Sequence, residues 1–118
     1  MSTDALVLTS IDARGVATIT LNRPQAFNSL SEAMLDALQT ELDRLAQDES
    51  VRVVVIAAAG KAFCAGHDLK EMRAEPSQAY YERLFAQCGR MMMSLQQLPV
   101  PVIARVLATV GVRTWTID

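Results

Sequence analysis

The sequence predicts an α/β domain whose sheet contains parallel strands. Residues 51–58, VRVVVIAA, are almost wholly apolar and β-branched, as expected for a strand that is covered on both faces of a parallel sheet. Residues 29–47 and 77–97, on either side of it, carry apolar residues at helical spacing. Strands that alternate with helices are typical of βαβ units, and a chain of 118 residues fits one domain.

Residues 5–21 predict a β-hairpin at the start of the chain. ALVLTSID and VATITLN alternate between apolar and polar residues and are rich in β-branched side chains, which is typical of paired strands. The segment ARG between them predicts the turn, because Gly15 can adopt a positive φ. Pro24 then ends the second strand, since proline cannot donate to a sheet ladder.

Residues 29–47 predict the first helix. Ser29 and Glu32 have the S-x-x-E spacing of a capping box, in which two side chains satisfy free N–H groups at the helix start. A single apolar stripe follows at steps of three, four and one. Its members are Leu30, Met34, Leu35, Leu38, Leu42 and Leu45.

After the strand at 51–58, the pattern predicts two more helices and a strand. Asp68 and Glu71 repeat the capping-box spacing, so a short helix is expected to begin at Asp68. Residues 77–97 predict a long helix, with Tyr80, Leu84, Phe85, Cys88, Met91, Met92 and Leu95 on one side. The run MMM is interpreted as flexible core filler. VPVIARV, 100–106, predicts a further buried strand.

The last twelve residues, LATVGVRTWTID, differ from the rest of the chain. They are too few to cover both faces of a sheet that ends in a buried strand. We therefore expect a domain over residues 1–106, an atypical tail over 107–118, and a core that is left partly exposed.

Composition excludes several classes of function. The net charge is −2, and Lys and Arg are scattered, so no nucleic-acid partner is expected. No apolar run approaches the roughly 20 residues that span a bilayer. Two separate cysteines and one histidine predict neither a disulfide framework nor a metal site. The start, MSTDALVLTS, resembles no signal or mitochondrial presequence, so a cytoplasmic protein is expected.

The stretch GKAFCAGHDLKEM, 60–72, is the candidate for chemistry. Ala65 and Gly66 have almost no side chain, so a ligand can approach the backbone closely. A helix that begins there leaves N–H groups unpaired and adds partial positive charge. Such groups suit an oxyanion or a polarised thioester carbonyl. The same residues also fit an ordinary connection from a strand to a helix.

The side chains of this stretch have simpler interpretations than catalysis. No base is visible beside Cys64, so a small buried hydrophobe is favoured over a nucleophile. His67 is read as lining a pocket rather than acting as a base, and Asp68 as a helix cap. Lys61 and Lys70 could meet phosphates, although exposed lysines usually meet only water.

Two motifs in the sequence resemble the enoyl-CoA hydratase/isomerase (crotonase) family. Leu21 to Leu30 matches LNRP-x-x-x-N-x-L, and Gly60 to Leu69 matches G-x-x-F-x-A-G-x-D-[LI]. Residues 98–106, LPVPVIARV, are similar to the family's next strand. The resemblance covers roughly residues 5 to 106 and implies the N-terminal part of a spiral of ββα units.

The resemblance also implies a site for an acyl-CoA thioester, with no cofactor other than the coenzyme A of the substrate. In the family two backbone N–H groups polarise the thioester carbonyl, and the first would be that of His67. The residues expected to line the substrate are Gln25, Ala26, Phe27, Ala65, Gly66, His67, Asp68, Leu69 and Lys70, with Lys61 near the phosphates. A homo-oligomer is expected for intact members of the family.

The chain departs from the family pattern after Val106. The family's second N–H comes from a glycine-rich H/N-G-x-x-x-G-G segment, and its catalytic Glu residues lie there and beyond; LATVGVRTWTID contains neither. Three interpretations stay open. The chain is an enoyl-CoA hydratase-like protein with little activity alone, a non-catalytic acyl-CoA or partner-binding fragment, or a non-functional truncation product.

Overall fold

The computed structural model describes residues 5–26, 28–60, 66–108 and 111–117. Its sheet has five strands in the order β1-β2-β3-β4-β5, and parallel pairs at its centre join β2 to β3 and β3 to β4. The strands are β1 (Val7–Ile11), β2 (Val16–Leu21), β3 (Val53–Ala58), β4 (Val102–Ala108) and β5 (Gly111–Ile117). The α/β prediction is therefore confirmed, and the β1-β2 pair is the predicted antiparallel hairpin.

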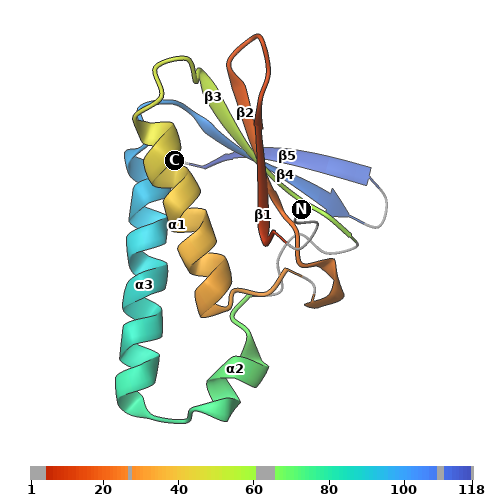
Figure 1. The fold of residues 1–118 in the computed structure, drawn as a ribbon. Coiled ribbons are helices and arrows are strands. Elements are labelled where there is room, and N and C mark those ends of the chain that lie inside the picture. The colour runs from red at the N-terminus through yellow and green to blue at the C-terminus, as the bar shows by residue number, and fades with distance from the viewer. Residues whose placement is uncertain (1–4, 27, 61–65, 109–110, 118) are drawn as a thin grey trace.

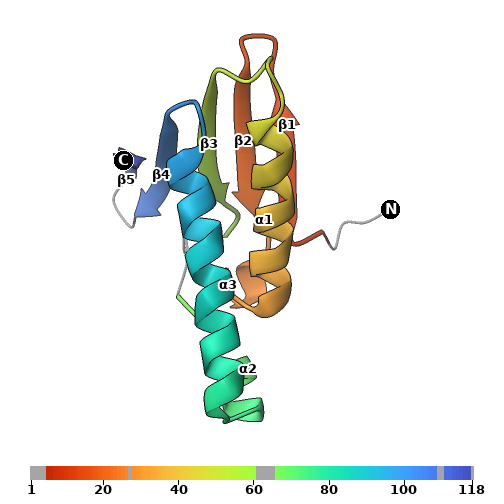
Figure 2. The ribbon, with the colours of Figure 1, turned by 90° about the vertical axis from the view of Figure 1, so that its left-hand side faces the viewer.

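The two long helices, α1 (Glu32–Ala46) and α3 (Gln78–Gln97), cover one face of this sheet. The shorter helices are the 3-10 helix η1 (Pro24–Ala26) and α2 (Leu69–Ala74). Figures 1 and 2 show α1 and α3 side by side against the sheet, with the short α2 near the start of α3. No described α-helix lies against the opposite face. In the described part of the chain no helix has the length and apolar character needed to cross a membrane.

The core lies between the sheet and the two long helices. Every second residue of β2 faces the helices and is buried, as Ala17, Ile19 and Leu21 show, because side chains alternate along a strand. The apolar stripe predicted for the first helix is confirmed except at Leu30, which precedes α1 and is partly buried. Its buried members on α1 are Met34, Leu35, Leu38, Leu42 and Leu45.

The first helix begins later than its sequence pattern predicts. The N-cap is Ser31, whose Oγ accepts a hydrogen bond from the Met34 N–H at 3.1 Å. The prediction that Ser29 caps the helix is therefore wrong. Backbone pairing of Leu30 with residues 66–68 holds the chain extended there, so the helix cannot start until that pairing ends.

The methionine run on α3 fills the core at only one of its three positions. Met91 is buried, whereas Met92 and Met93 are about half exposed, at 48% and 51%. Phe85, also predicted for the buried side, is 51% exposed. Consecutive residues on a helix are about 100° apart, so three in a row cannot all face the sheet. The core-filler prediction therefore holds for Met91 alone.

The C-terminal segment adds a strand that the sequence pattern did not predict. Strand β4 runs to Ala108, and β5 pairs with it antiparallel from Val102↔Ile117 to Ala108↔Gly111. The tail thus extends the edge of the sheet and covers neither of its faces.

Candidate functional site

The candidate site lies where two parallel strands end. Strands β2 and β3 are in register up to the pair Leu21↔Ala58, so the connections that follow them leave the same edge of the sheet. These connections carry the two sequence motifs. We call residues 22–26, 28–30 and 66–71 together the junction.

Asn28 and Gly60 allow the connection that follows β2 to lie close to the connection that follows β3. Asn28 is fully buried with a positive φ of 54°, which asparagine tolerates better than most residues. Its Oδ1 accepts from the Arg23 N–H at 2.7 Å, and its Nδ2 donates to the Ala59 carbonyl at 2.9 Å. At Gly60, a β-carbon would lie 2.6 Å from the Pro24 side chain. Glycine is therefore required for the close approach of the two connections.

A short parallel bridge then joins the connections and leaves one amide without an acceptor among the described residues. The Leu30 N–H donates to the Gly66 carbonyl at 2.6 Å, and the Asp68 N–H donates to the Leu30 carbonyl at 3.1 Å. In parallel pairing of this kind, the N–H of the intervening residue, His67, points away from Leu30. None of the described residues accepts a hydrogen bond from the His67 N–H.

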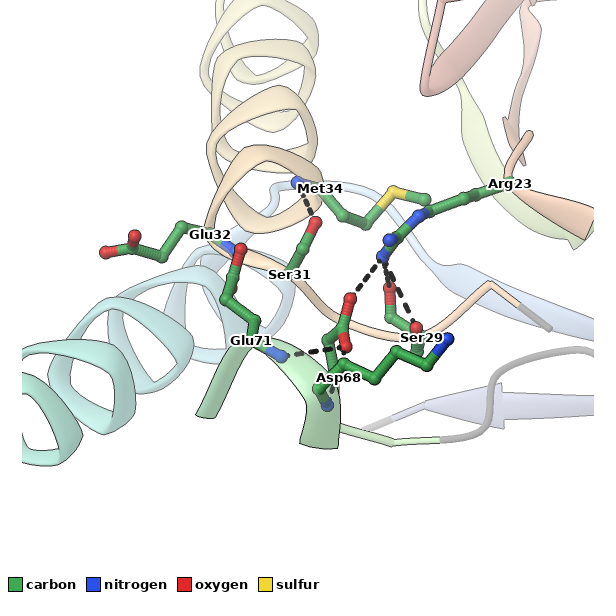
Figure 3. A network of polar contacts seen from close by, with 8 residues as sticks. Arg23, Ser29, Ser31, Glu32, Met34, Asp68 and Glu71 are labelled. Atoms are coloured by element: carbon green, nitrogen blue, oxygen red, sulfur yellow. Dashed lines mark hydrogen bonds and ion pairs between the residues drawn. The ribbon is translucent and has the colours of Figure 1, made fainter. Parts of the chain in front are cut away.

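An ion pair lies beside this bridge (Figure 3). Arg23 Nη1 is 2.8 Å from Asp68 Oδ2 and 3.3 Å from the Ser29 hydroxyl. The Arg23 side chain is 24% exposed and that of Asp68 only 11%. Asp68 Oδ1 accepts from the Lys70 and Glu71 N–H groups at 3.1 and 3.2 Å, so Asp68 caps α2 as predicted.

These contacts set the charge state of Asp68. The hydrogen bond from Arg23, with the backbone N–H of Glu71 and the positive charge of Arg23, holds the pKa of the Asp68 carboxyl below its ordinary value of 3.8. Burial acts in the opposite direction but is outweighed. At neutral pH Asp68 is thus an anion, paired with a cation on one side and with a helix start on the other.

The junction is also tied to the start of α1. Glu71 Oε1 accepts a hydrogen bond from the Glu32 N–H at 2.8 Å (Figure 3), so this side chain of α2 caps α1. The predicted capping box of α2 is therefore half wrong, because Glu71 does not return to the Asp68 N–H, which is already bonded to Leu30. The sequence spacing could not show that Glu71 serves a different helix.

On the Gly66 side of the His67 amide, no described side chain fills the space. Gly66 has a φ of +87°, and a β-carbon there would meet no described atom within 4 Å. The His67 ring packs edge-on against Phe85, with 5.3 Å between ring centroids. His67 Nδ1 is buried and has no hydrogen-bond partner among the described residues. His67 Nδ1 thus has no described partner to orient it as a base, and the interpretation of His67 as a lining residue stays a prediction.

A second titratable side chain near α2 is not a base at neutral pH. Tyr80 of α3 is 2% exposed, and this burial, together with the nearby charges of Glu71 and Glu32, raises its pKa to about 12. The hydroxyl stays protonated. Within the described part of the chain, no group of three or more His, Cys, Asp or Glu side chains is arranged to hold a metal ion.

The structure places the sequence-predicted residues as follows. Gly66, His67 and Asp68 lie together in the junction. Ala26 lies in η1, where its carbonyl accepts from the Ser29 N–H at 3.1 Å, and Leu69 and Lys70 are exposed on α2. Phe27, Lys61, Cys64 and Ala65 lie outside the described residues.

Two residues that build the junction, Arg23 and Asn28, were not assigned a role from the sequence. A third, Glu71, was assigned to α2 but caps α1. Arg23 and Asn28 are letters of the LNRP-x-x-x-N-x-L motif, which is the signal that could have identified them.

Comparison with known proteins connects this geometry to relatives. The model of the enoyl-CoA hydratase/isomerase family matches residues 12–110. Enoyl-CoA hydratase domain-containing protein 3, mitochondrial, from Xenopus laevis is 44% identical over 92 residues, which are 78% of this chain and 31% of that protein. The 1,2-epoxyphenylacetyl-CoA isomerase of Escherichia coli is 33% identical over 99 residues, 79% of this chain and 37% of the isomerase.

Solved structures agree with the sequence matches. The crystal structure of an enoyl-CoA hydratase from Mycobacterium smegmatis superposes with a TM-score of 0.84 and 69% identity, over 86% of this chain and 39% of that one. The chain thus spans between about three and four tenths of the length of these relatives. The match of the family model to most of the chain, together with the fold, shows that the chain belongs to the enoyl-CoA hydratase/isomerase family.

Proposed function

We propose that this chain carries one half of a binding site for an acyl-CoA thioester, in which the His67 N–H donates a hydrogen bond to the thioester carbonyl. The observation that supports this most is the state of that amide. Its neighbours on both sides are held by Leu30, while the N–H itself is bonded to no described residue. Family membership supports the choice of a thioester as the acceptor.

The chemistry follows from where charge develops. When an acyl thioester forms an enolate-like intermediate, negative charge gathers on the carbonyl oxygen. A fixed N–H aimed at that oxygen stabilises the charge without reorganising, and in other enzymes the loss of one such donor costs about 3–4 kcal/mol. Gly66 contributes by adding no side chain at the place where the oxygen would approach.

Coenzyme A would extend from the junction over neighbouring segments. We propose that Ala26 of η1 lies near the pantetheine, and that Lys70, which is exposed on α2, lies on the side of the diphosphate. Ala26 is connected to the His67 segment through Ser29 and Arg23. The Ser29 N–H donates to the Ala26 carbonyl, and Arg23 contacts both Ser29 and Asp68, which lies between His67 and α2.

We further propose that this chain alone does not hydrate an enoyl-CoA at an enzyme's rate. Addition of water across the double bond needs groups that deliver and remove protons. His67 Nδ1 has no orienting partner among the described residues, and Tyr80 stays protonated. Crotonyl-CoA incubated with the chain and followed at its ultraviolet band should show no turnover above background. Turnover comparable to that of a full-length family member would overturn this proposal.

Binding is tested by nuclear magnetic resonance with two matched ligands. Crotonyl-CoA has the carbonyl oxygen, whereas the thioether S-butyl-CoA lacks it. The His67 amide proton should move downfield with crotonyl-CoA only, and the dissociation constant should be weaker than micromolar because half of the site is present. Equal shifts with both ligands, or none with either, would contradict a role for this amide in carbonyl recognition.

A further inference from the structure

One guanidinium nitrogen contacts both sides of the bridge that presents His67. Arg23 Nη1 lies 2.8 Å from Asp68 Oδ2 on one connection, and 3.3 and 3.5 Å from the hydroxyl and carbonyl oxygens of Ser29 on the other. Ser29 directly precedes Leu30, and Asp68 directly follows His67. The guanidinium therefore lies next to both members of the Leu30–His67 bridge.

The bridge itself is too small to fix the amide alone. It consists of two backbone hydrogen bonds, Leu30 to Gly66 and Asp68 to Leu30. Gly66 precedes His67 with a φ of +87°, and a β-carbon on it would meet no described atom within 4 Å, so no described side chain packs against that position. An isolated pair of strands this short is not stable in water without further contacts. The contacts of Arg23 supply a restraint from the side.

Asp68 transmits this restraint into α2. Its second oxygen, Oδ1, accepts from the N–H groups of Lys70 and Glu71, and Glu71 in turn caps α1 at Glu32. The carboxylate thus connects Arg23 to two helices (Figure 3). Charge-assisted hydrogen bonds of this kind are stronger and more directional than neutral ones.

We propose that Arg23 is a positioning residue for the His67 N–H. Its guanidinium holds Ser29 and Asp68 together, so that the bridge keeps its register and the amide of His67 keeps its direction away from Leu30. The link between this positioning and the thioester rests on the proposed function. The direction of the His67 amide is a property of the free protein and can be measured without a ligand.

The test uses the whole chain with matched substitutions. Arg23→Gln removes the charge, Arg23→Lys keeps the charge with a shorter reach, and Arg14→Gln makes the same chemical change at the exposed hairpin turn. Far-ultraviolet circular dichroism establishes that each variant is folded. Asp68→Asn keeps one side-chain oxygen that can cap α2 but loses the charge, so it tests the same contact from its other partner if Arg23→Gln does not fold.

Two measurements on the free protein test positioning. One is the resonance of the His67 amide, and the other is the hydrogen-exchange rate of the Asp68 amide relative to core amides of β2 and β3. In Arg23→Gln the His67 resonance should move, and Asp68 should exchange roughly tenfold faster after correction for global opening. Arg23→Lys should fall between this variant and the wild type, and Arg14→Gln should match the wild type. A purely structural role would speed exchange of all amides alike.

The third measurement, the shift of the His67 resonance on adding crotonyl-CoA, separates the two proposals. If the wild type responds and Arg23→Gln loses the response, both stand. If Arg23→Gln is folded and keeps the wild-type resonance, Asp68 exchange and ligand response, the positioning role is overturned while the proposed function stands. If the wild type does not respond to the thioester, the proposed function is overturned, and the measurements on the free protein still decide what Arg23 does.

Discussion

The hairpin turn between β1 and β2 and the junction each contain an Asp–Arg ion pair, and the pairs differ in their surroundings. The distance is 2.8 Å in both. Arg14 and Asp12 of the hairpin are two residues apart, and their side chains are 81% and 42% exposed. Arg23 and Asp68 of the junction are 45 residues apart, and their exposures are 24% and 11%. Only the second pair closes a long stretch of chain in a poorly solvated place.

The hairpin turn and the junction each contain a glycine with the same backbone conformation, but the surroundings of the two glycines differ. Gly15 has a φ of +86° and Gly66 one of +87°. A β-carbon on Gly15 would lie 2.6 Å from the Ser50 carbonyl oxygen, whereas one on Gly66 would meet no described atom. At the hairpin the glycine is structural and the ion pair is peripheral. At the junction the ion pair is shielded from water, and no described atom lies within 4 Å of where the glycine's β-carbon would be.

The largest difference is expected between alanine substitutions at the two glycines. Gly15→Ala forces a β-carbon into a backbone carbonyl and adds left-handed strain, so it should lower the free energy of unfolding by about 3 kcal/mol. Gly66→Ala adds the strain alone, about 1 kcal/mol. Urea unfolding followed by circular dichroism measures both. Equal losses would show that the space beside Gly66 is not open.

Removal of the junction arginine should have the next largest effect. Arg23→Ala leaves the Asp68 carboxylate without its cation in a site that is mostly shielded from water. The loss should be about 2 kcal/mol, below the value for a fully buried pair because Arg23 is partly solvated. The change in the urea midpoint at constant slope measures it. A loss below about 0.5 kcal/mol would place this pair in the same class as an exposed one.

The contrast between the hairpin turn and the junction also explains how much could be predicted from the sequence. The hairpin, its turn glycine and the leucine stripe of α1 depend on local patterns, and they were predicted correctly. The start of α1 was not, because Leu30 pairs with residues about 37 positions away, which no local capping rule can anticipate. Glu71 was assigned to the wrong helix for the same reason.

For the candidate site, the motif identified the stretch that holds His67 but not what supports it. Gly66 and Asp68 were recognised from local chemistry, namely a small residue and a helix cap. The contact of Arg23 with Asp68 depends on two strand ends lying side by side, and it becomes visible only once the sheet order is known.

Acid should weaken the junction through Asp68. Because folding lowers the pKa of this carboxyl, its stabilising contribution is fully present above the unfolded value near 3.8 and is lost as pH falls through the folded value. Wild type should therefore be more stable than Asp68→Asn at pH 6, and the difference should shrink between pH 4 and lower values. Urea unfolding of both proteins at several pH values measures the difference. A difference that is constant with pH would show that the charge of Asp68 does not account for its contribution.

The smallest effect is expected at the hairpin. Arg14→Ala removes the side-chain contacts with Asp12, but the Asp12 carboxylate still accepts from the backbone N–H groups of Arg14 and Val16 at 2.8 and 3.1 Å. These bonds shape the turn and do not involve the arginine side chain. An exposed pair gains little from attraction in water and loses side-chain freedom. The urea midpoint of Arg14→Ala should therefore equal that of the wild type within error, and the difference between the two midpoints should not change with added salt. A midpoint shift as large as that of Arg23→Ala would mean that distance in an ion pair, rather than its surroundings, decides its contribution in this chain.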